Sequence, residues 1–224
     1  MTNLNSSAKK SPKNPIRFLV HLNEEQKQAK QVILNNKITV IKGQAGSGKS
    51  LVAAQVALDL LFRREVEKVI LTRPAVTSGE EIGFLPGSKE DKLAPYTAAI
   101  YDNMYRLYNK EKIDREITEG RIEVIPVAFM RGRNLTNCCV VVDEGQNITH
   151  RQMELILGRI CEGSKMIICG DTAQIDLKDK KLSGFGFICN NLTNVKGFAV
   201  VTLKTNHRDP IVEDILKVYL DHRD

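Results

Sequence analysis

Eight consecutive residues, 43–50, have the types and the spacing of a phosphate-binding loop. They read Gly-Gln-Ala-Gly-Ser-Gly-Lys-Ser and fit the pattern G-x-x-x-x-G-K-[ST]. The three glycines let backbone N–H groups converge on phosphate oxygens, and a helix that begins at Lys49 adds its positive dipole end. The Lys49 ammonium can bridge the β- and γ-phosphates, and the Ser50 hydroxyl can hold Mg²⁺. The residues expected to bind the nucleotide are Gly43, Gln44, Ala45, Gly46, Ser47, Gly48, Lys49, Ser50 and Leu51.

The segments on either side of this loop support that interpretation. Residues 38–41 are apolar or β-branched and predict a strand, whereas residues 51–62 have the apolar periodicity of a helix. A strand, a glycine-rich loop and a helix in this order form the context in which the pattern binds phosphate. A chance Gly-Lys-Ser in an ordinary glycine-rich turn is the alternative.

A second chemical signal follows the apolar run at residues 138–142. This run ends in Asp143 and Glu144, which is the Walker B pattern. Asp143 is expected to hold Mg²⁺ opposite Ser50, and Glu144 to orient and polarise the attacking water. A strand that simply runs into an acidic loop is the structural alternative. Because a phosphate-transferring kinase needs no water-activating Glu at this place, Glu144 favours hydrolysis of a nucleoside triphosphate.

Three further polar residues are candidates for the same site. Residues 167–174 form another apolar run that ends in Gly-Asp-x-x-Gln, so the Gln174 amide can contact the γ-phosphate or the attacking water; a simple turn is the alternative. The Gln26 amide can pair with adenine N6 and N7, or it is an exposed helical glutamine. Arg208 can face a phosphate, act on a neighbouring subunit, or be a surface cation.

The rest of the pattern predicts an α/β fold with a mostly parallel sheet and helices on both faces. Strands are expected at 38–41, 68–72, 121–127, 138–142, 165–169 and 198–203, and helices at 24–34, 51–62, 95–109, 150–161 and 210–220, with a long loop at 75–94. The strands are apolar throughout, as strands buried on both faces are. Since ligands of such sheets bind at the carboxyl ends of the strands, we expect the polar motifs to meet there.

The composition limits the classes of protein to which this chain can belong. The chain has 224 residues, a net charge of +6 and five cysteines without a C-x-x-C pair, so we expect buried reduced thiols and no zinc site. Residues 1–20 hold four basic and no acidic residues and predict a disordered tail, which either contacts nucleic acid phosphates or stays solvated. Residues 21–224 are expected to form one domain. No membrane span and no signal-peptide core is visible, so we expect a cytoplasmic protein.

Taken together, the motifs resemble the first motor domain of superfamily-one helicases. The shared stretches are Gln26 and residues 43–50, 72–74, 143–147, 170–174 and 206–208. Residues 83–87 and 129–135 narrow the resemblance to the PhoH family of P-loop ATPases, from about residue 20 to the C-terminus. It implies a single RecA-like domain that uses ATP and Mg²⁺, often forms a ring, and has RNA-related or helicase-like roles. Gly145 departs from the usual Ala and Asn134 from a common Thr, but neither change removes a catalytic group.

A superfamily-one motor binds nucleotide between two such domains, and the second domain supplies arginines to the γ-phosphate. Because we expect one domain here, we predict a homo-oligomer, in particular a hexameric ring, in which Arg131, Arg133 or Arg208 reaches the next subunit's site. Arg131 and Arg133 are the first choice because they flank a glycine just before the strand at 138–142. Single-stranded RNA, or else DNA, is the expected partner.

Two other functions remain compatible with these motifs. A nucleotide-regulated scaffold would open and close an assembly without moving along nucleic acid, so indifference of ATP turnover to RNA would favour it. A small-molecule kinase would share the phosphate-binding loop, but Glu144 and the lack of an evident Arg-rich lid segment count against it.

Overall fold

The structure of this protein, a computed structural model, describes residues 16–74 and 100–222. Within them, six strands form one sheet in the order β3-β2-β4-β5-β1-β6, and every neighbouring pair is parallel. The predicted RecA-like α/β fold is therefore confirmed. The strands are β1 (Ile38–Gly43), β2 (Lys68–Thr72), β3 (Ile122–Val124), β4 (Cys138–Val142), β5 (Lys165–Gly170) and β6 (Phe198–Leu203).

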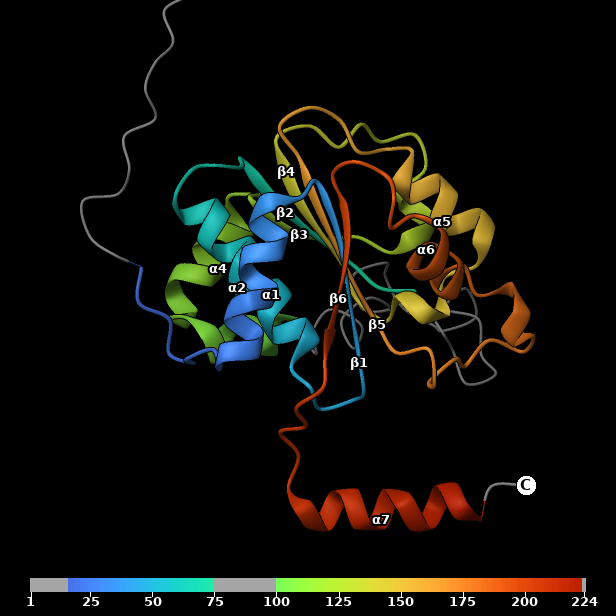
Figure 1. The fold of residues 1–224 in the computed structure, drawn as a ribbon. Coiled ribbons are helices and arrows are strands. Elements are labelled where there is room, and N and C mark those ends of the chain that lie inside the picture. The colour runs from blue at the N-terminus through green and yellow to red at the C-terminus, as the bar shows by residue number, and fades with distance from the viewer. Residues whose placement is uncertain (1–15, 75–99, 223–224) are drawn as a thin grey trace, which may run out of the picture.

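Helices cover both faces of the sheet (Figure 1). One face carries α1 (Glu24–Asn35), α2 (Lys49–Phe62), a helix at residues 100–107, and α4 (Lys110–Thr118). The other face carries α5 (His150–Leu157), α6 (Phe185–Asn191) and the short 3₁₀ helix η2 (Val127–Met130). The last helix, α7 (Pro210–Asp221), stands apart from both layers. No helix within the described ranges is long and apolar enough to cross a membrane.

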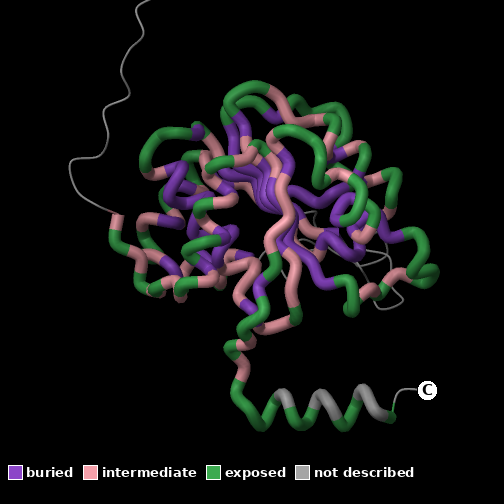
Figure 2. The backbone as a smooth tube through the Cα atoms, viewed as in Figure 1, coloured by how far each residue is buried: buried purple, intermediate pink, exposed green. Residues whose placement is uncertain are grey.

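The apolar side chains of the strands pack into two hydrophobic cores, one on each side of the sheet. All five residues of β4 are buried, and Val141 packs into the first core while Val140 and Val142 pack into the second. This alternation explains why the strand reads as a continuous apolar run, since both of its faces are covered. Figure 2 shows the central strands buried and the outer loops exposed, whereas the edge strand β6 is mostly half-buried.

Helix α2 fixes the phosphate-binding loop against the sheet. Ten consecutive residues, 52–61, are buried, so this helix is surrounded by α1, the sheet and its neighbours. The one carboxylate among these ten, Asp59, accepts hydrogen bonds from Lys30 (2.6 Å) and Arg63 (2.7 Å), which satisfies its charge. A helix held on all sides keeps its first residues, Lys49 and Ser50, at the carboxyl edge of the sheet.

Several predicted element boundaries were wrong. Strand β3 ends at Val124 rather than 127, because Pro126 precedes the turn of η2. Helix α5 ends at Leu157 rather than 161, because the following residues leave the helix to pair with Leu135: Cys161 donates to the Leu135 carbonyl at 2.9 Å, and Leu135 donates to the Arg159 carbonyl at 3.0 Å. Helices α4 and α6 were not predicted.

Three predicted segments lie wholly or partly outside the described residues. The loop at 75–94 and the start of the helix at 95–109 lie there, and the helix is described at 100–107. Residues 1–15 of the predicted tail lie there too. Its last residues rest on that helix, since Leu19 donates to the Leu107 carbonyl at 2.9 Å and the Phe18 ring meets Tyr108 at 5.8 Å.

Candidate functional site

A pocket of about 610 Å³ opens at the carboxyl ends of β1, β4 and β5. Because β5 lies between β1 and β4 in the sheet, the three loops that follow these strands meet here. The predicted site residues that line the pocket are Gln26, Ala45, Gly46, Gly48, Lys49, Ser50, Leu51, Asp143, Glu144, Gln174 and Arg208. Gly43, Gln44 and Ser47 complete the same loop beside it.

The phosphate-binding loop has a shape that its glycines require. Gly46 and Gly48 have φ angles of +88° and +83°, in the left-handed region that other residues avoid. A Cβ atom at Gly43 would lie 2.4 Å from the Leu203 carbonyl oxygen. Lys49 Nζ folds back over this loop and donates to the carbonyls of Gly43 (2.7 Å) and Gln44 (2.9 Å). The buried Ser47 hydroxyl has no hydrogen-bond partner within the described residues, as expected of a loop shaped to hold an external acceptor.

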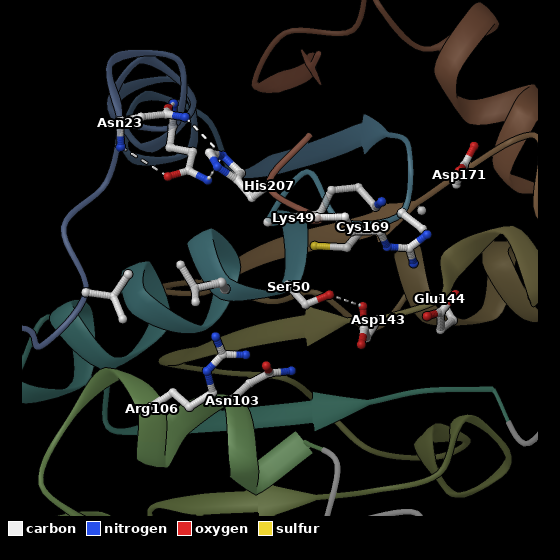
Figure 3. A pocket seen from close by; sticks show the side chains of 18 of the residues that line it. Asn23, Lys49, Ser50, Asn103, Arg106, Asp143, Glu144, Cys169, Asp171 and His207 are labelled. Carbon is white, nitrogen blue, oxygen red and sulfur yellow. Dashed lines mark hydrogen bonds between the residues drawn. The ribbon is translucent and has the colours of Figure 1, made fainter. Parts of the chain in front are cut away.

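One hydrogen bond joins the two principal motifs across the pocket (Figure 3). Ser50 Oγ donates to Asp143 Oδ1 at 2.7 Å, although the residues are 93 positions apart. Asp143 is held at the end of β4, because its backbone N–H donates to the Thr72 carbonyl at 2.8 Å. A hydroxyl and a carboxylate oxygen side by side are ligands that suit Mg²⁺. The described residues offer no cluster of three His, Cys, Asp or Glu that could hold a metal.

Glu144 is positioned beside this pair by its backbone and by two neighbours. Its φ and ψ of 51° and 40° lie in the left-handed region, which a non-glycine residue occupies at a cost. Gln146 Nε2 donates to Glu144 Oε2 at 2.6 Å, and Arg73 Nη2 lies 3.5 Å from Glu144 Oε1. The carboxylate is therefore fixed at the rim of the pocket, next to Asp143 in Figure 3.

The loop after β5 is tied to the loop after β4 through Gln146. The side-chain oxygen Oε1 of Gln146 accepts a hydrogen bond from the Asp171 N–H at 3.1 Å. Asp171 also makes the turn that its sequence suggested, because its carboxylate accepts from Ala173 N at 3.0 Å. Both interpretations of Gly-Asp-x-x-Gln are thus compatible, since the turn forms and Gln174 lines the pocket. Gln146 was missed, although an amide two residues after a predicted catalytic acid is a signal.

Gln26 lies under the phosphate-binding loop and is 5% exposed, so it is not an exposed helical glutamine. Its Oε1 accepts from the Asn23 N–H at 3.1 Å in a capping box at the start of α1, and its Nε2 donates to the Ser47 carbonyl at 3.4 Å. His207 Nε2 lies 3.3 Å from Gln26 Nε2 and 3.1 Å from Asn23 Nδ2. Because both neighbours are amide donors, the His207 nitrogen acts as the acceptor. Adenine contact by Gln26 stays a prediction.

Three further side chains of the pocket were not predicted. Asn103 and Arg106 are one turn apart on the helix at 100–107 and line the pocket below Ser50 and Asp143 (Figure 3). Only tertiary packing brings them there, so no local pattern could have found them. Cys169 lines the pocket from β5, but its burial raises the pKa of the thiol well above its ordinary value, which keeps the sulfur protonated and a poor nucleophile.

The three candidate arginines occupy different places. Arg208 belongs to the pocket of its own chain, where its side chain packs so close to Gly46 that a Cβ there would lie 2.6 Å from its Cγ. Arg133 lies beside the edge strand β3, where Nη1 donates to Glu123 at 3.0 Å. Arg131 is exposed after η2. Neither Arg131 nor Arg133 lines the pocket, so their action on a neighbouring subunit stays a prediction.

The parallel sheet, the glycine loop and the paired Ser50 and Asp143 define a P-loop nucleotide-binding protein. The family model for PhoH-like proteins matches residues 19–220, and the chain belongs to this family. It is 41% identical over 196 residues to a PhoH-like protein of Synechocystis sp., covering 87% of this chain and 60% of the relative. It is also 40% identical over 179 residues to a PhoH-like protein of Bacillus subtilis, covering 79% and 56%. The chain therefore spans little more than half the length of these curated relatives.

Solved structures with a similar arrangement belong to larger proteins. The Pif1 helicase from Candida albicans aligns with a TM-score of 0.46 and 18% identity, covering 88% of this chain and 44% of the helicase. The SWI2/SNF2 ATPase core of Sulfolobus solfataricus aligns with a TM-score of 0.47 and 14% identity, covering 77% and 37%. These similarities concern the fold alone.

Proposed function

We propose that this chain is a Mg²⁺-dependent ATPase that couples hydrolysis to the binding and remodelling of single-stranded nucleic acid. RNA is the expected partner ahead of DNA. The observation that carries the proposal is the 2.7 Å contact between Ser50 and Asp143, which brings the phosphate loop and the acidic strand end to one point. Family membership supports it, because the motifs of this family are those of P-loop ATPases.

Five side chains of the pocket have distinct tasks in this proposal. Lys49 and the N–H groups of its loop bind the phosphates, and Ser50 and Asp143 would hold Mg²⁺, which neutralises charge between the β- and γ-phosphates. Glu144 accepts a proton from the attacking water, and Gln146 and Arg73 keep its carboxylate in place. Gln174 contacts the γ-phosphate or that water.

ATP turnover, measured with Mg²⁺ or with EDTA and with or without an oligo(U) RNA, tests this function. We expect turnover that requires Mg²⁺ and rises with RNA. Turnover that ignores RNA would favour the nucleotide-regulated scaffold, which shares the site but not the coupling. Absence of turnover under all conditions, including the assembled form, would contradict the proposal.

A homo-oligomer, with a hexameric ring as the expected form, belongs to the same proposal. Helix α7 supports it, because five of its described side chains are large, apolar and exposed, as at surfaces that bind other proteins. These are Ile211, Val212, Ile215, Val218 and Tyr219. The native mass in solution tests it, and a monomer with full activity would contradict it.

We place the protein in the cytoplasm, where its five free cysteines stay reduced.

A further inference from the structure

The segment that leaves the pocket after Gln174 carries several exposed cations and leads to an exposed aromatic ring. It passes through Lys178, Lys180, Lys181 and Leu182, which are exposed, and enters α6 with Phe187, whose side chain is 51% exposed. The His150 ring at the start of α5 meets the Phe187 ring edge-on at 5.6 Å. We call Lys178, Lys180, Lys181, Leu182, Phe187 and His150 the basic–aromatic patch.

Backbone contacts hold this patch in place against α5. Ser183 pairs with Thr149 in an antiparallel bridge, and the Gly184 N–H donates to the Ile148 carbonyl at 2.9 Å. The short helix η4 (Lys180–Leu182) is capped by Asp179, whose carboxylate accepts from the Lys181 N–H at 3.0 Å. The lysines are thus presented from an ordered turn next to the N-termini of α5 and α6.

The charges of the patch are available to an external partner. None of its three lysines forms an ion pair within residues 16–74 and 100–222. The two acidic residues of the same segment serve the fold: Asp179 caps η4, and Asp176 accepts from Asn147 Nδ2 at 3.0 Å. Unpaired lysines beside an exposed ring match a polymer that offers both phosphates and stackable bases.

We infer that the basic–aromatic patch binds a single strand of nucleic acid, with the lysines on its phosphates and a base stacked on Phe187. A duplex fits less well, because its bases are already stacked on one another. An acidic protein segment would use the lysines but would not require an aromatic ring. The exposed ring of Phe187 therefore favours a single strand over a duplex or an acidic protein segment.

The patch is connected to the nucleotide pocket through a short run of contacts, and this part of the inference rests on the proposed ATPase function. Asn147, three residues after Glu144, accepts from the Asp176 N–H at 2.8 Å and donates to its carboxylate. Gln174 and Asp171, at the start of the same segment, line the pocket. A strand bound at the patch would therefore stabilise the segment that carries Gln174, and we expect it to raise ATP turnover.

A charge-matched pair of double variants tests the lysines. Lys180→Gln/Lys181→Gln removes two charges from the patch, whereas Lys37→Gln/Lys196→Gln removes two exposed charges at the opposite, amino-terminal end of the sheet. Binding of fluorescent oligo(U) and oligo(dT) is measured across a salt series. Each lost phosphate contact lowers the slope of log K against log salt by about 0.7. We expect the slope to fall by about 1.4 in the patch variant and to stay unchanged in the control.

Two substitutions at Phe187 test stacking. Phe187→Leu keeps an apolar side chain without a ring, and Phe187→Tyr keeps the ring. Loss of one stacked base weakens binding by about tenfold or more, so we expect Leu to lose this affinity and Tyr to retain it. Because Phe187 is half exposed, the melting temperatures of both variants should match that of the wild type.

The outcomes separate this inference from the proposed function. Weaker binding of either oligomer by the patch variants, with turnover in the absence of nucleic acid unchanged, supports the inference. Wild-type affinity in both patch variants overturns it while leaving the proposed function intact. A wild type that binds neither oligomer overturns both the patch and the proposed coupling to nucleic acid, but not ATP turnover itself. A wild type that binds the strand at the patch without hydrolysing ATP supports the patch and contradicts the ATPase.

Discussion

Glu144 has a left-handed backbone, and its carboxylate is held by Gln146 and Arg73. Because this backbone conformation costs free energy in a non-glycine residue, we infer that it is kept for the position that it gives the carboxylate. We predict that Glu144→Gln binds ATP as well as the wild type but hydrolyses it about 10²–10⁴-fold more slowly, because an amide cannot accept the water's proton. Turnover and nucleotide affinity are measured in parallel. Glu154→Gln, an exposed acid on α5, is the control. Unchanged turnover in Glu144→Gln would remove this residue from the mechanism.

Gly46 shows how narrowly the loop is shaped. In Gly46→Ala, a Cβ would lie 2.5 Å from Asn206 Oδ1, and the left-handed backbone adds a strain of roughly 1–2 kcal/mol. We predict weaker ATP binding and a free energy of unfolding lower by at least this amount, measured by denaturant titration. Gly186→Ala is the matched control, because nothing lies within 4 Å of its Cβ and its helical backbone favours Ala. Equal stability of the two variants would contradict the prediction.

For individual residues, the sequence was sufficient where a local motif marks the site. The loop glycines, Lys49, Ser50 and Asp143 were found because their order along the chain is itself the pattern. Asn103 and Arg106 could not be assigned, because they enter the pocket from a distant helix that tertiary packing brings near.

Among the elements, α4 is anchored by a nearly buried acid that titrates with the fold. Burial opposes ionisation of Glu116, but hydrogen bonds from Arg121 (2.5 Å) and Lys112 (2.6 Å) outweigh it and lower its pKa below the ordinary 4.5. A lowered pKa stabilises the folded state above pH 4.5, and this contribution is lost as the pH falls through the folded-state pKa. Acid therefore weakens the attachment of α4 to β3.

The variant Glu116→Gln measures this contribution. We predict a free energy of unfolding lower by roughly 1–3 kcal/mol at pH 7, with the difference from wild type shrinking below pH 4.5. Glu111→Gln, at an exposed position on the same helix, should change stability by about 0.5 kcal/mol or less. A difference that is constant from pH 7 to pH 3 would show that the ion pairs do not stabilise α4.

The elements that were missed lack strong local signals. Helix α6 has seven residues, begins after a glycine without a side-chain cap and contains Gly186, so packing of Phe185 and Ile188 into the second core decides its structure. Helix α4 is short and mostly charged. Apart from β3, the strands were placed to within two residues. Strand β4 is the clearest case, because burial on both faces leaves an unbroken apolar run.

For the whole molecule, the sequence predicted that the polar motifs would meet at one edge of a parallel sheet, and they do. It did not give the strand order, which places β5 between the two principal motifs and so delivers Gln174 to the space between them. Nor could it show that Arg131 and Arg133 lie away from their own chain's pocket. Because these arginines do not line that pocket, the contact with a γ-phosphate that we propose for them would have to be made in a neighbouring subunit.

Mixing two inactive variants tests action between subunits. The variant Glu144→Gln keeps Arg131 and Arg133 but has an inactive ATP site. The variant Arg131→Ala/Arg133→Ala keeps an intact ATP site but lacks both arginines, and their loss should lower the rate by about 10³–10⁵-fold. Co-expressed in equal amounts, they should recover about a quarter of wild-type turnover, because one interface in four then pairs an intact site with intact arginines. Co-expression of Glu144→Gln with Lys49→Ala, both dead at the site, is the control and should recover nothing. A mixture of the first pair that stays inactive, in an assembly of unchanged native mass, would mean that these arginines do not act across subunits.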